Sequence, residues 1–195
     1  MKKKGYIQVY TGDGKGKTTA AIGISIRALG AGKKVMFLQF MKAKVYSEHN
    51  ILPTISPSFK LRTIGKPFFV VKEGAMSAEE AEKWKDKAVF FPPGQPPKEY
   101  LDIVAKGIAE AREALQSGEY DLVVLDELNC ALYFELVSWT EVKEMLQSRA
   151  EGVEVILTGR GAIPELIELA DLVTEMREIK HYYQQGVEAR RGIEN

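Results

Sequence analysis

Short apolar runs alternate along the chain with longer segments in which apolar residues return every three or four positions. The runs are rich in β-branched and aromatic residues, which is typical of strands. Two of them, residues 35–38 and 122–125, are apolar throughout, as expected for parallel strands covered on both faces. The predicted strands are residues 6–11, 35–38, 122–125, 153–157 and 172–176.

The segments between these runs predict helices. In residues 18–29 the apolar side chains recur at i, i+4 and i+7, and Gly30 follows as a stop signal. Ser77 and Ser138 are each followed three residues later by glutamate, a capping box that opens a helix. The predicted helices are residues 18–29, 77–91, 98–116, 138–146 and 164–170. Because strands and helices alternate, we expect an α/β fold with a mainly parallel sheet and helices on both faces.

A long insertion, at about residues 43–97, follows the second predicted strand. Up to residue 76 it shows no sustained period and carries several prolines, so we expect irregular structure apart from a short strand at residues 60–64. Loops of this length are uncommon unless they are functional. The total length of 195 residues predicts a single domain spanning residues 1–195.

Composition and charge exclude several classes of protein. The 27 basic residues balance the 27 acidic ones, so no net field favours a nucleic acid or an anionic membrane surface. No apolar run approaches the roughly 18 residues that a membrane helix needs. The lone cysteine, Cys130, cannot form an internal disulfide and fits a reducing compartment. We expect a protein of the cytoplasm that uses neither nucleic acid nor membrane as partner.

The strongest chemical signal is the sequence TGDGKGKTT at residues 11–19, between the first predicted strand and the first helix. Glycines let several backbone N–H groups turn toward a polyphosphate, and the helix N-terminus adds positive potential. Thr11 replaces the first glycine of the G-x-x-x-x-G-K-[ST] pattern, so this is a variant phosphate-binding loop, or P-loop. The candidate phosphate ligands are Gly12, Asp13, Gly14, Lys15, Gly16, Lys17, Thr18 and Thr19. A dinucleotide fingerprint fits less well because Lys17 stands where its last glycine belongs.

Polar residues also follow two later strands. Asp126 and Glu127 come directly after an apolar strand, where a P-loop enzyme places the carboxylates that hold Mg²⁺ with the loop threonine, here Thr18. From the topology we expect them beside the first strand. Arg160 follows another strand and is a candidate for the ligand-binding edge of the sheet.

Other candidates carry weaker signals. His49 and His181 have no partner at metal-ligand spacing, so solvated or hydrogen-bonded imidazoles are the better interpretation. Cys130 is most simply a small buried residue at a helix start, and Trp84 with Phe91 is interpreted as core. The pair Phe68 and Phe69 lies in the long insertion and is a candidate for ligand contact, because exposed loop aromatics often bind ligands.

Several of these segments together resemble the P-loop type of ATP:corrinoid adenosyltransferases. They are residues 12–19, Gln39-Phe40 with Lys42, LDELN at 125–129, LTGRG at 157–161, ELIELADLVTEMREIKH at 165–181 and the ending at 186–194. The resemblance covers nearly the whole chain outside about residues 43–97. It implies a P-loop fold and transfer of the 5′-deoxyadenosyl group of ATP to the Co(I) of a corrinoid, with triphosphate released.

The resemblance also implies roles for residues. Lys15 and catalytic Lys17 would neutralise phosphates, Thr18 and catalytic Glu127 would serve Mg²⁺ (or Mn²⁺), and Arg27 would contact the nucleotide. In the family an aromatic segment helps to expel the lower cobalt ligand; here Phe68 or Phe69 would do so, with Val70 where a tryptophan is usual. A homodimer and a separate electron donor, such as a flavoprotein, are implied as partners.

Two other hypotheses remain open from the residues alone. One is a P-loop ATPase or kinase in which Glu127 orients water or an acceptor hydroxyl, against which Thr11 argues mildly. The other is a non-catalytic module that carries a nucleotide or corrinoid to a partner.

Overall fold

The computed structural model describes residues 4–43, 46–66, 68–75, 77–86 and 88–194. Within these residues the main sheet has six strands in the order β3-β2-β6-β7-β1-β8, and all neighbouring strands are parallel. The strands are β1 (Ile7–Thr11), β2 (Val35–Phe40), β3 (Phe59–Ile64), β6 (Leu122–Asp126), β7 (Glu154–Thr158) and β8 (Leu172–Glu175). The mainly parallel sheet expected from the apolar runs is confirmed.

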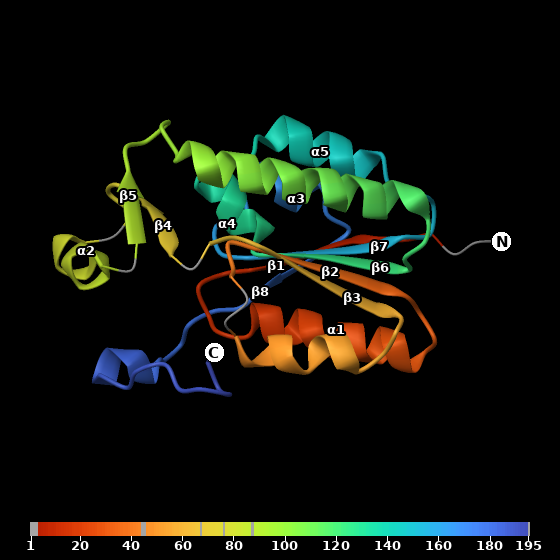
Figure 1. Ribbon diagram of the computed structural model, residues 1–195, viewed down its shortest axis with the longest axis horizontal. Coiled ribbons are helices and arrows are strands. Elements are labelled where there is room, and N and C mark those ends of the chain that lie inside the picture. Colours follow the sequence, from red (N-terminus) through yellow and green to blue (C-terminus); the bar gives the residue numbers. More distant parts are fainter. Residues whose placement is uncertain (1–3, 44–45, 67, 76, 87, 195) are drawn as a thin grey trace.

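Helices cover both faces of this sheet (Figure 1), as expected. One face carries α3 (Lys98–Ser117), α4 (Leu128–Tyr133) and α5 (Trp139–Gln147), and the other carries α1 (Lys17–Gly30). A hydrophobic cluster fills each side of the sheet, because side chains of successive strand residues point to opposite faces. The described helices include none long and apolar enough to cross a membrane.

The long insertion is more regular than the sequence suggested. Its strand β3 joins the main sheet at the edge, in register with β2 from Val35↔Phe59 to Phe40↔Ile64, so the expected short strand is confirmed. Short 3₁₀ turns, η1 (Ser47–Asn50) and η2 (Leu52–Thr54), precede it. Strands β4 (Phe69–Lys72) and β5 (Ala88–Phe91) pair in parallel as a separate small sheet. The expectation of irregular structure was therefore wrong for these segments.

The predicted helix at residues 77–91 was also wrong in its second half. Helix α2 (Ala78–Trp84) stops at Trp84, and the residues that continue its apolar spacing form β5 instead. The run Val89-Phe90-Phe91 has high strand preference, and pairing with β4 gives its backbone groups partners that a longer helix would not. Helix α4 contains Cys130, so the expected helix start near this residue is confirmed. Its bounds were not predicted, because a helix of six residues shows no period.

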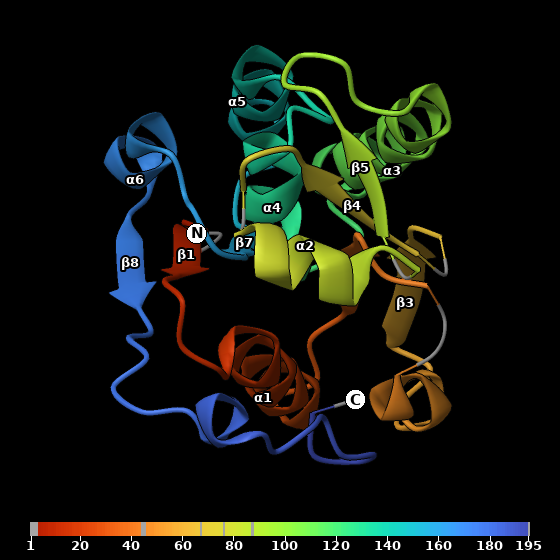
Figure 2. The ribbon, with the colours of Figure 1, turned by 90° about the vertical axis from the view of Figure 1, so that its left-hand side faces the viewer.

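The C-terminal half follows the predicted order closely. Gly118 ends α3 in a left-handed conformation, with φ of 65°. The Ser138 hydroxyl accepts a hydrogen bond from the Glu141 amide and opens α5 as a capping box. Helix α6 (Pro164–Leu169) begins at a proline and leads into β8 at the sheet edge (Figure 2).

Strand order corrects one expectation about the site. Strand β6, which ends in Asp126, does not lie beside β1, because β7 is inserted between them. The connection from β1 through α1 to β2 likewise passes under β7 and β6, since β1 and β2 are not neighbours. Helix α1 packs against both β6 and β7, and this brings its first residues close to Asp126.

The close packing of α3 on the sheet generates a stability prediction. A Cβ atom at Gly107 would lie 2.6 Å and 2.8 Å from the Cδ1 and Cγ2 atoms of Ile64 and 3.0 Å from Cε1 of the buried Phe40. We expect Gly107→Ala to lower the free energy of unfolding by about 1–2 kcal/mol, because overpacking outweighs the gain in helix propensity.

Urea unfolding of Gly107→Ala is best compared with that of Gly23→Ala, because Gly23 lies inside α1 and its added Cβ would meet no atom within 4 Å beyond its chain neighbours and the backbone of its own helix. The control should gain roughly 0.5–1 kcal/mol. Equal stabilities for the two variants would contradict the proposed close contact.

Candidate functional site

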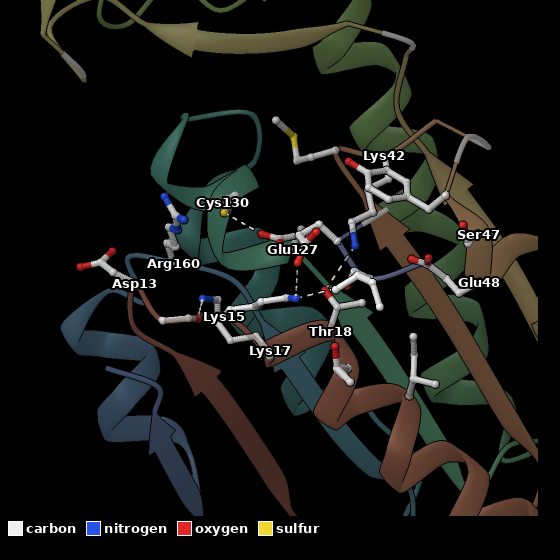
Figure 3. A pocket seen from close by; sticks show the side chains of 18 of the residues that line it. Asp13, Lys15, Lys17, Thr18, Lys42, Ser47, Glu48, Glu127, Cys130 and Arg160 are labelled. Carbon is white, nitrogen blue, oxygen red and sulfur yellow. Dashed lines mark hydrogen bonds and ion pairs between the residues drawn. The ribbon is translucent and has the colours of Figure 1, made fainter. Parts of the chain in front are cut away.

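A cavity of about 890 Å³ opens at the carboxyl edge of the sheet. Its walls come from the loop after β1, from the ends of β2, β6 and β7, from the insertion and from the segment that follows β8. In open α/β sheets this edge is where ligands bind. Figure 3 shows Lys17, Thr18, Lys42 and Glu127 converging at its centre, with Arg160, Asp13 and Lys15 to one side.

The loop between β1 and α1 has the backbone expected of a phosphate cradle. Gly12 and Gly16 adopt φ of 91° and 118°, which residues with a Cβ rarely adopt. Gly14 lies against the chain after β8: its amide donates to the Met176 carbonyl at 2.7 Å, and a Cβ there would be 2.8 Å from that oxygen. The glycines are therefore needed for loop shape and for close backbone contact.

Lys17 opens α1 and is almost completely buried. Its ammonium donates to the carbonyl oxygens of Gly12 at 2.6 Å and Gly14 at 2.8 Å. Burial lowers the pKa of Lys17, while the nearby Glu127 carboxylate works in the opposite direction. A buried ammonium bound to weak carbonyl acceptors gains strongly when anionic oxygens replace them.

Asp126 is fully buried and connects several segments of the site. Its Oδ1 accepts hydrogen bonds from the hydroxyls of Thr18 at 2.9 Å and Thr158 at 2.6 Å. Its Oδ2 accepts from Gln39 at 3.1 Å and from the Lys42 ammonium at 3.0 Å. The carboxylate thus fixes the first turn of α1 against the ends of β2, β6 and β7.

Lys42 is a site residue that the sequence analysis quoted only as part of a motif. Its ammonium also donates to the Thr18 hydroxyl at 3.2 Å, so it lies between Thr18 and Asp126. Burial works to lower the pKa of Lys42, but the Asp126 and Glu127 carboxylates together hold it above its ordinary value. Its position just after β2, at the same sheet edge as Asp126, was the available signal.

His49 belongs to the same hydrogen-bond network and is connected to Asp126 through Gln39. It is buried, and its Nε2 lies 2.6 Å from Oε1 of Gln39, whose amide nitrogen donates to Asp126. The interpretation of His49 as a hydrogen-bonded imidazole is confirmed. Its role is to orient Gln39.

Glu127 enters the cavity through an unusual backbone conformation. Its φ of 60° is in the left-handed region, and its amide donates to the Thr158 hydroxyl at 3.0 Å. The Cys130 thiol donates to Glu127 Oε2 at 2.9 Å. Burial and the Glu127 charge raise the pKa of Cys130, so the thiol stays protonated and remains a donor. Cys130 therefore lines the cavity and positions Glu127, beyond the simple packing role expected for it.

The opposite part of the cavity is apolar. Val70, Val71, Trp84 and Phe134 line it together with Met41. The interpretation of Trp84 as core was wrong, because α2 ends over the cavity instead of packing into the core of the main sheet. Val70, at the position where the resembling family usually has tryptophan, shares this wall with Trp84.

The remaining predicted residues are only partly brought together. Asp13, Lys15, Thr19 and Arg160 line the cavity, and Gly14 and Gly16 do so as well. Arg27 is exposed in the last turn of α1 and does not line it, because ten residues of helix extend about 15 Å.

The aromatic pair of the insertion also lies differently from expectation. The Phe68 ring packs edge-on against Tyr100 at 5.6 Å between centroids, and the Tyr100 hydroxyl donates to the Phe68 carbonyl at 2.7 Å. Phe68 is not among the residues lining the cavity. The backbone of Phe69 opens β4, but its side chain lies outside the described part of the structure. Ligand contact by either ring stays a prediction.

Comparison with known proteins points to one family. A family described as ATP:corrinoid adenosyltransferase BtuR/CobO/CobP matches residues 3–195. A corrinoid adenosyltransferase of Escherichia coli (strain K12) is 33% identical over 193 residues, which are 98% of this chain and 86% of that protein. CobA of Salmonella typhimurium is 32% identical over 195 residues, covering 100% of this chain and 87% of CobA. A relative from Pseudomonas aeruginosa is 33% identical, with 98% and 84% covered.

The buried position of Lys17 generates a binding prediction. We expect Lys17→Met to weaken the binding of ATP roughly tenfold to a hundredfold, because one charge-assisted hydrogen bond contributes about 1.5–3 kcal/mol. Isothermal titration calorimetry measures this affinity directly. Lys34→Met is the matched control, because Lys34 is exposed beyond the far end of α1. Unchanged affinity of the Lys17 variant would rule out its contact with phosphates.

Proposed function

The chain belongs to the ATP:corrinoid adenosyltransferase family, and we propose that the cavity at the carboxyl edge of the sheet is its active site. The protein is an enzyme that transfers the 5′-deoxyadenosyl group of ATP to the Co(I) of a corrinoid and releases triphosphate. The alternatives of a P-loop ATPase, a kinase or a carrier module have less support. The relatives from Escherichia coli and Salmonella typhimurium are named corrinoid adenosyltransferases, and the chain matches 86% and 87% of their lengths.

One observation carries the assignment of the site: a phosphate loop and an apolar wall face the same cavity. Lys17 and Thr18 stand on one side, and Trp84, Val70 and Phe134 stand on the other. A triphosphate needs the first surface, and the planar, largely apolar ring of a corrinoid suits the second. The reaction requires both substrates to meet between them.

The reaction is a displacement at carbon. The electron pair of Co(I) forms a bond to C5′ of ATP, and the bond between C5′ and the α-phosphate oxygen breaks, with its electron pair leaving on triphosphate. No proton has to be removed, so the protein needs no general base. Its contribution is to position the two substrates and to stabilise the negative charge that grows on the leaving group.

The cations of the loop suit this task. In our proposal Lys17 exchanges the carbonyls of Gly12 and Gly14 for phosphate oxygens, and Lys15 and Arg160 neutralise further charge from the rim. For Lys17 the exchange replaces two neutral carbonyl acceptors by an anion, and the interaction of each cation strengthens as charge moves onto the phosphates. These residues therefore favour the transition state over the bound ground state.

We propose Mg²⁺ or Mn²⁺ as the metal cofactor, held by Thr18 and Glu127 with Asp126 directly or through water. Hydroxyl and carboxylate oxygens are the donors that these ions prefer, and Thr18 and Asp126 already gather one cation, the Lys42 ammonium. Within the described residues no group of three or more His, Cys, Asp or Glu side chains is placed to hold a metal. Water and phosphate oxygens would complete the shell. The ion would neutralise triphosphate charge.

Further proposals follow from the chemistry and the family resemblance. Cobalt must reach the Co(I) state, and we propose a separate electron donor protein, such as a flavoprotein, as the reductant. A homodimer and a location in the cytoplasm remain our proposals as well. Light scattering of the purified chain measures its molar mass and so tests the homodimer directly.

A product assay tests the proposed function. With ATP, Mg²⁺ and chemically reduced cobalamin, the protein should form a light-sensitive adenosyl product and equimolar triphosphate. Ultraviolet–visible spectra follow the corrinoid, and anion chromatography identifies the phosphate product. Formation of ADP and phosphate at the same rate with and without corrinoid would favour an ATPase instead.

The position of Lys42 generates a prediction about metal binding. We expect Lys42→Met to bind Mn²⁺ roughly tenfold more tightly than the wild type, because a competing ammonium at the Thr18–Asp126 position is lost. Electron paramagnetic resonance of free Mn²⁺ measures this without turnover. Lys42→Arg keeps the charge and should resemble the wild type. Unchanged Mn²⁺ affinity in a folded Lys42→Met protein would place the metal elsewhere.

A further inference from the structure

A carboxylate of the chain itself projects into the cavity that we assign to the nucleotide. Glu194 lines the cavity, and its side chain is only 13% exposed, although it lies in a surface segment. We propose that Lys15, Tyr182 and Arg190 form an anion-binding subsite that Glu194 fills in the free chain and a phosphate of the nucleotide fills after binding. The proposal deepens the proposed function and rests on it for the identity of the anion.

The contacts of Glu194 are those of an anion in a built site. Its Oε1 accepts from the Lys15 ammonium at 2.9 Å, from Arg190 Nη2 at 3.2 Å and from the Tyr182 hydroxyl. Its Oε2 accepts from the backbone amide of Arg190 at 2.8 Å and from Nε at 3.2 Å. A guanidinium fork, an ammonium, a phenol and a backbone amide are the donors that proteins use for phosphates as well as carboxylates.

The donors are positioned independently of Glu194. The Arg190 guanidinium stacks over the Tyr182 ring, 5.0 Å from its centroid. Lys15 also contacts the Tyr182 hydroxyl at 3.4 Å. These contacts keep three donor groups together when the carboxylate leaves, so the subsite persists for another anion.

The subsite lies beside the phosphate loop. Figure 2 shows the chain after β8, in blue, crossing beneath α1 toward its end. The loop amide of Gly14 bonds to the Met176 carbonyl, and Lys15 is itself a loop residue. Lys15 lines the cavity and contacts both the Tyr182 hydroxyl and the Glu194 carboxylate, which Arg190 also binds, so it connects these donors to the loop that contains Lys17.

Charge requires an exchange when nucleotide binds. A triphosphate carries several negative charges, and Glu194 beside it would add repulsion in a partly buried cavity. Hydrogen bonds from Arg190, Tyr182 and Lys15 lower the pKa of Glu194, so the carboxylate is charged while it occupies the subsite. The carboxylate must move away, and the phosphate takes its donors. The apparent affinity for nucleotide is therefore lower than the intrinsic affinity, because only the molecules in which Glu194 has left the subsite can bind the phosphate there.

Tripolyphosphate binding tests both halves of the proposal without corrinoid or turnover. Glu194→Ala should bind inorganic tripolyphosphate roughly threefold to tenfold more tightly than the wild type, because the internal competitor is gone. In that background, Arg190→Ala should weaken binding at least about tenfold, because a charged hydrogen-bond partner of the anion is lost. Arg191→Ala in the same background is the matched control, since Arg191 is the exposed neighbour. Its affinity should equal that of Glu194→Ala alone.

Calorimetry gives the affinities, and urea unfolding shows that each variant is folded. Weaker or unchanged binding by Glu194→Ala would overturn its role as competitor. Equal binding by the Arg190 and Arg191 double variants would overturn the subsite. Failure of the product assay in a protein that shows the expected tripolyphosphate affinities would overturn the enzymatic assignment but leave the subsite standing.

Discussion

The site depends on one buried carboxylate. Asp126 has no exposed surface, and a charge in that position is tolerated only when it is paired and hydrogen-bonded. Its donors come from separate segments: Thr18 from α1, Thr158 from β7, and Gln39 and Lys42 from β2 and the residues after it. Satisfying this one group therefore fixes how the phosphate loop, the sheet edge and the entrance to the insertion lie relative to one another.

Two residues near this carboxylate have a strained backbone. Met41 and Glu127 both adopt left-handed conformations, with φ of 61° and 60°, directly after β2 and β6. These conformations cost on the order of 1–3 kcal/mol each in residues with a side chain. Gln39 and Asp126 are paired across the two strands, so the two strained residues follow neighbouring strand ends. Both residues line the same cavity.

The two kinds of surface in the cavity have different origins. The phosphate side is built by the α/β framework, whose strand ends and helix N-terminus concentrate polar groups. On the apolar side, Val70, Val71 and Trp84 come from β4 and α2 of the insertion, and Met41 and Phe134 follow β2 and α4. The segment after β8 adds a third element, because it contributes the Glu194 carboxylate to the cavity and the Arg190 guanidinium that binds this carboxylate. In our proposal the α/β framework binds the nucleotide, and the insertion and the segment after β8 shape the rest of the cavity, where the second substrate would bind.

The local features of the protein could be predicted from the sequence because each depends on neighbouring residues. The loop at residues 12–18, the apolar strands, the Ser138 capping box and the Gly118 helix end are all of this kind. Tertiary contacts decided the rest. Lys42 meets Asp126 across 84 positions and Lys15 meets Glu194 across 179, so no local pattern indicates either pair. Residues 88–91 have helical spacing but form a strand, because pairing with β4 satisfies their backbone, and Trp84 consequently faces the cavity.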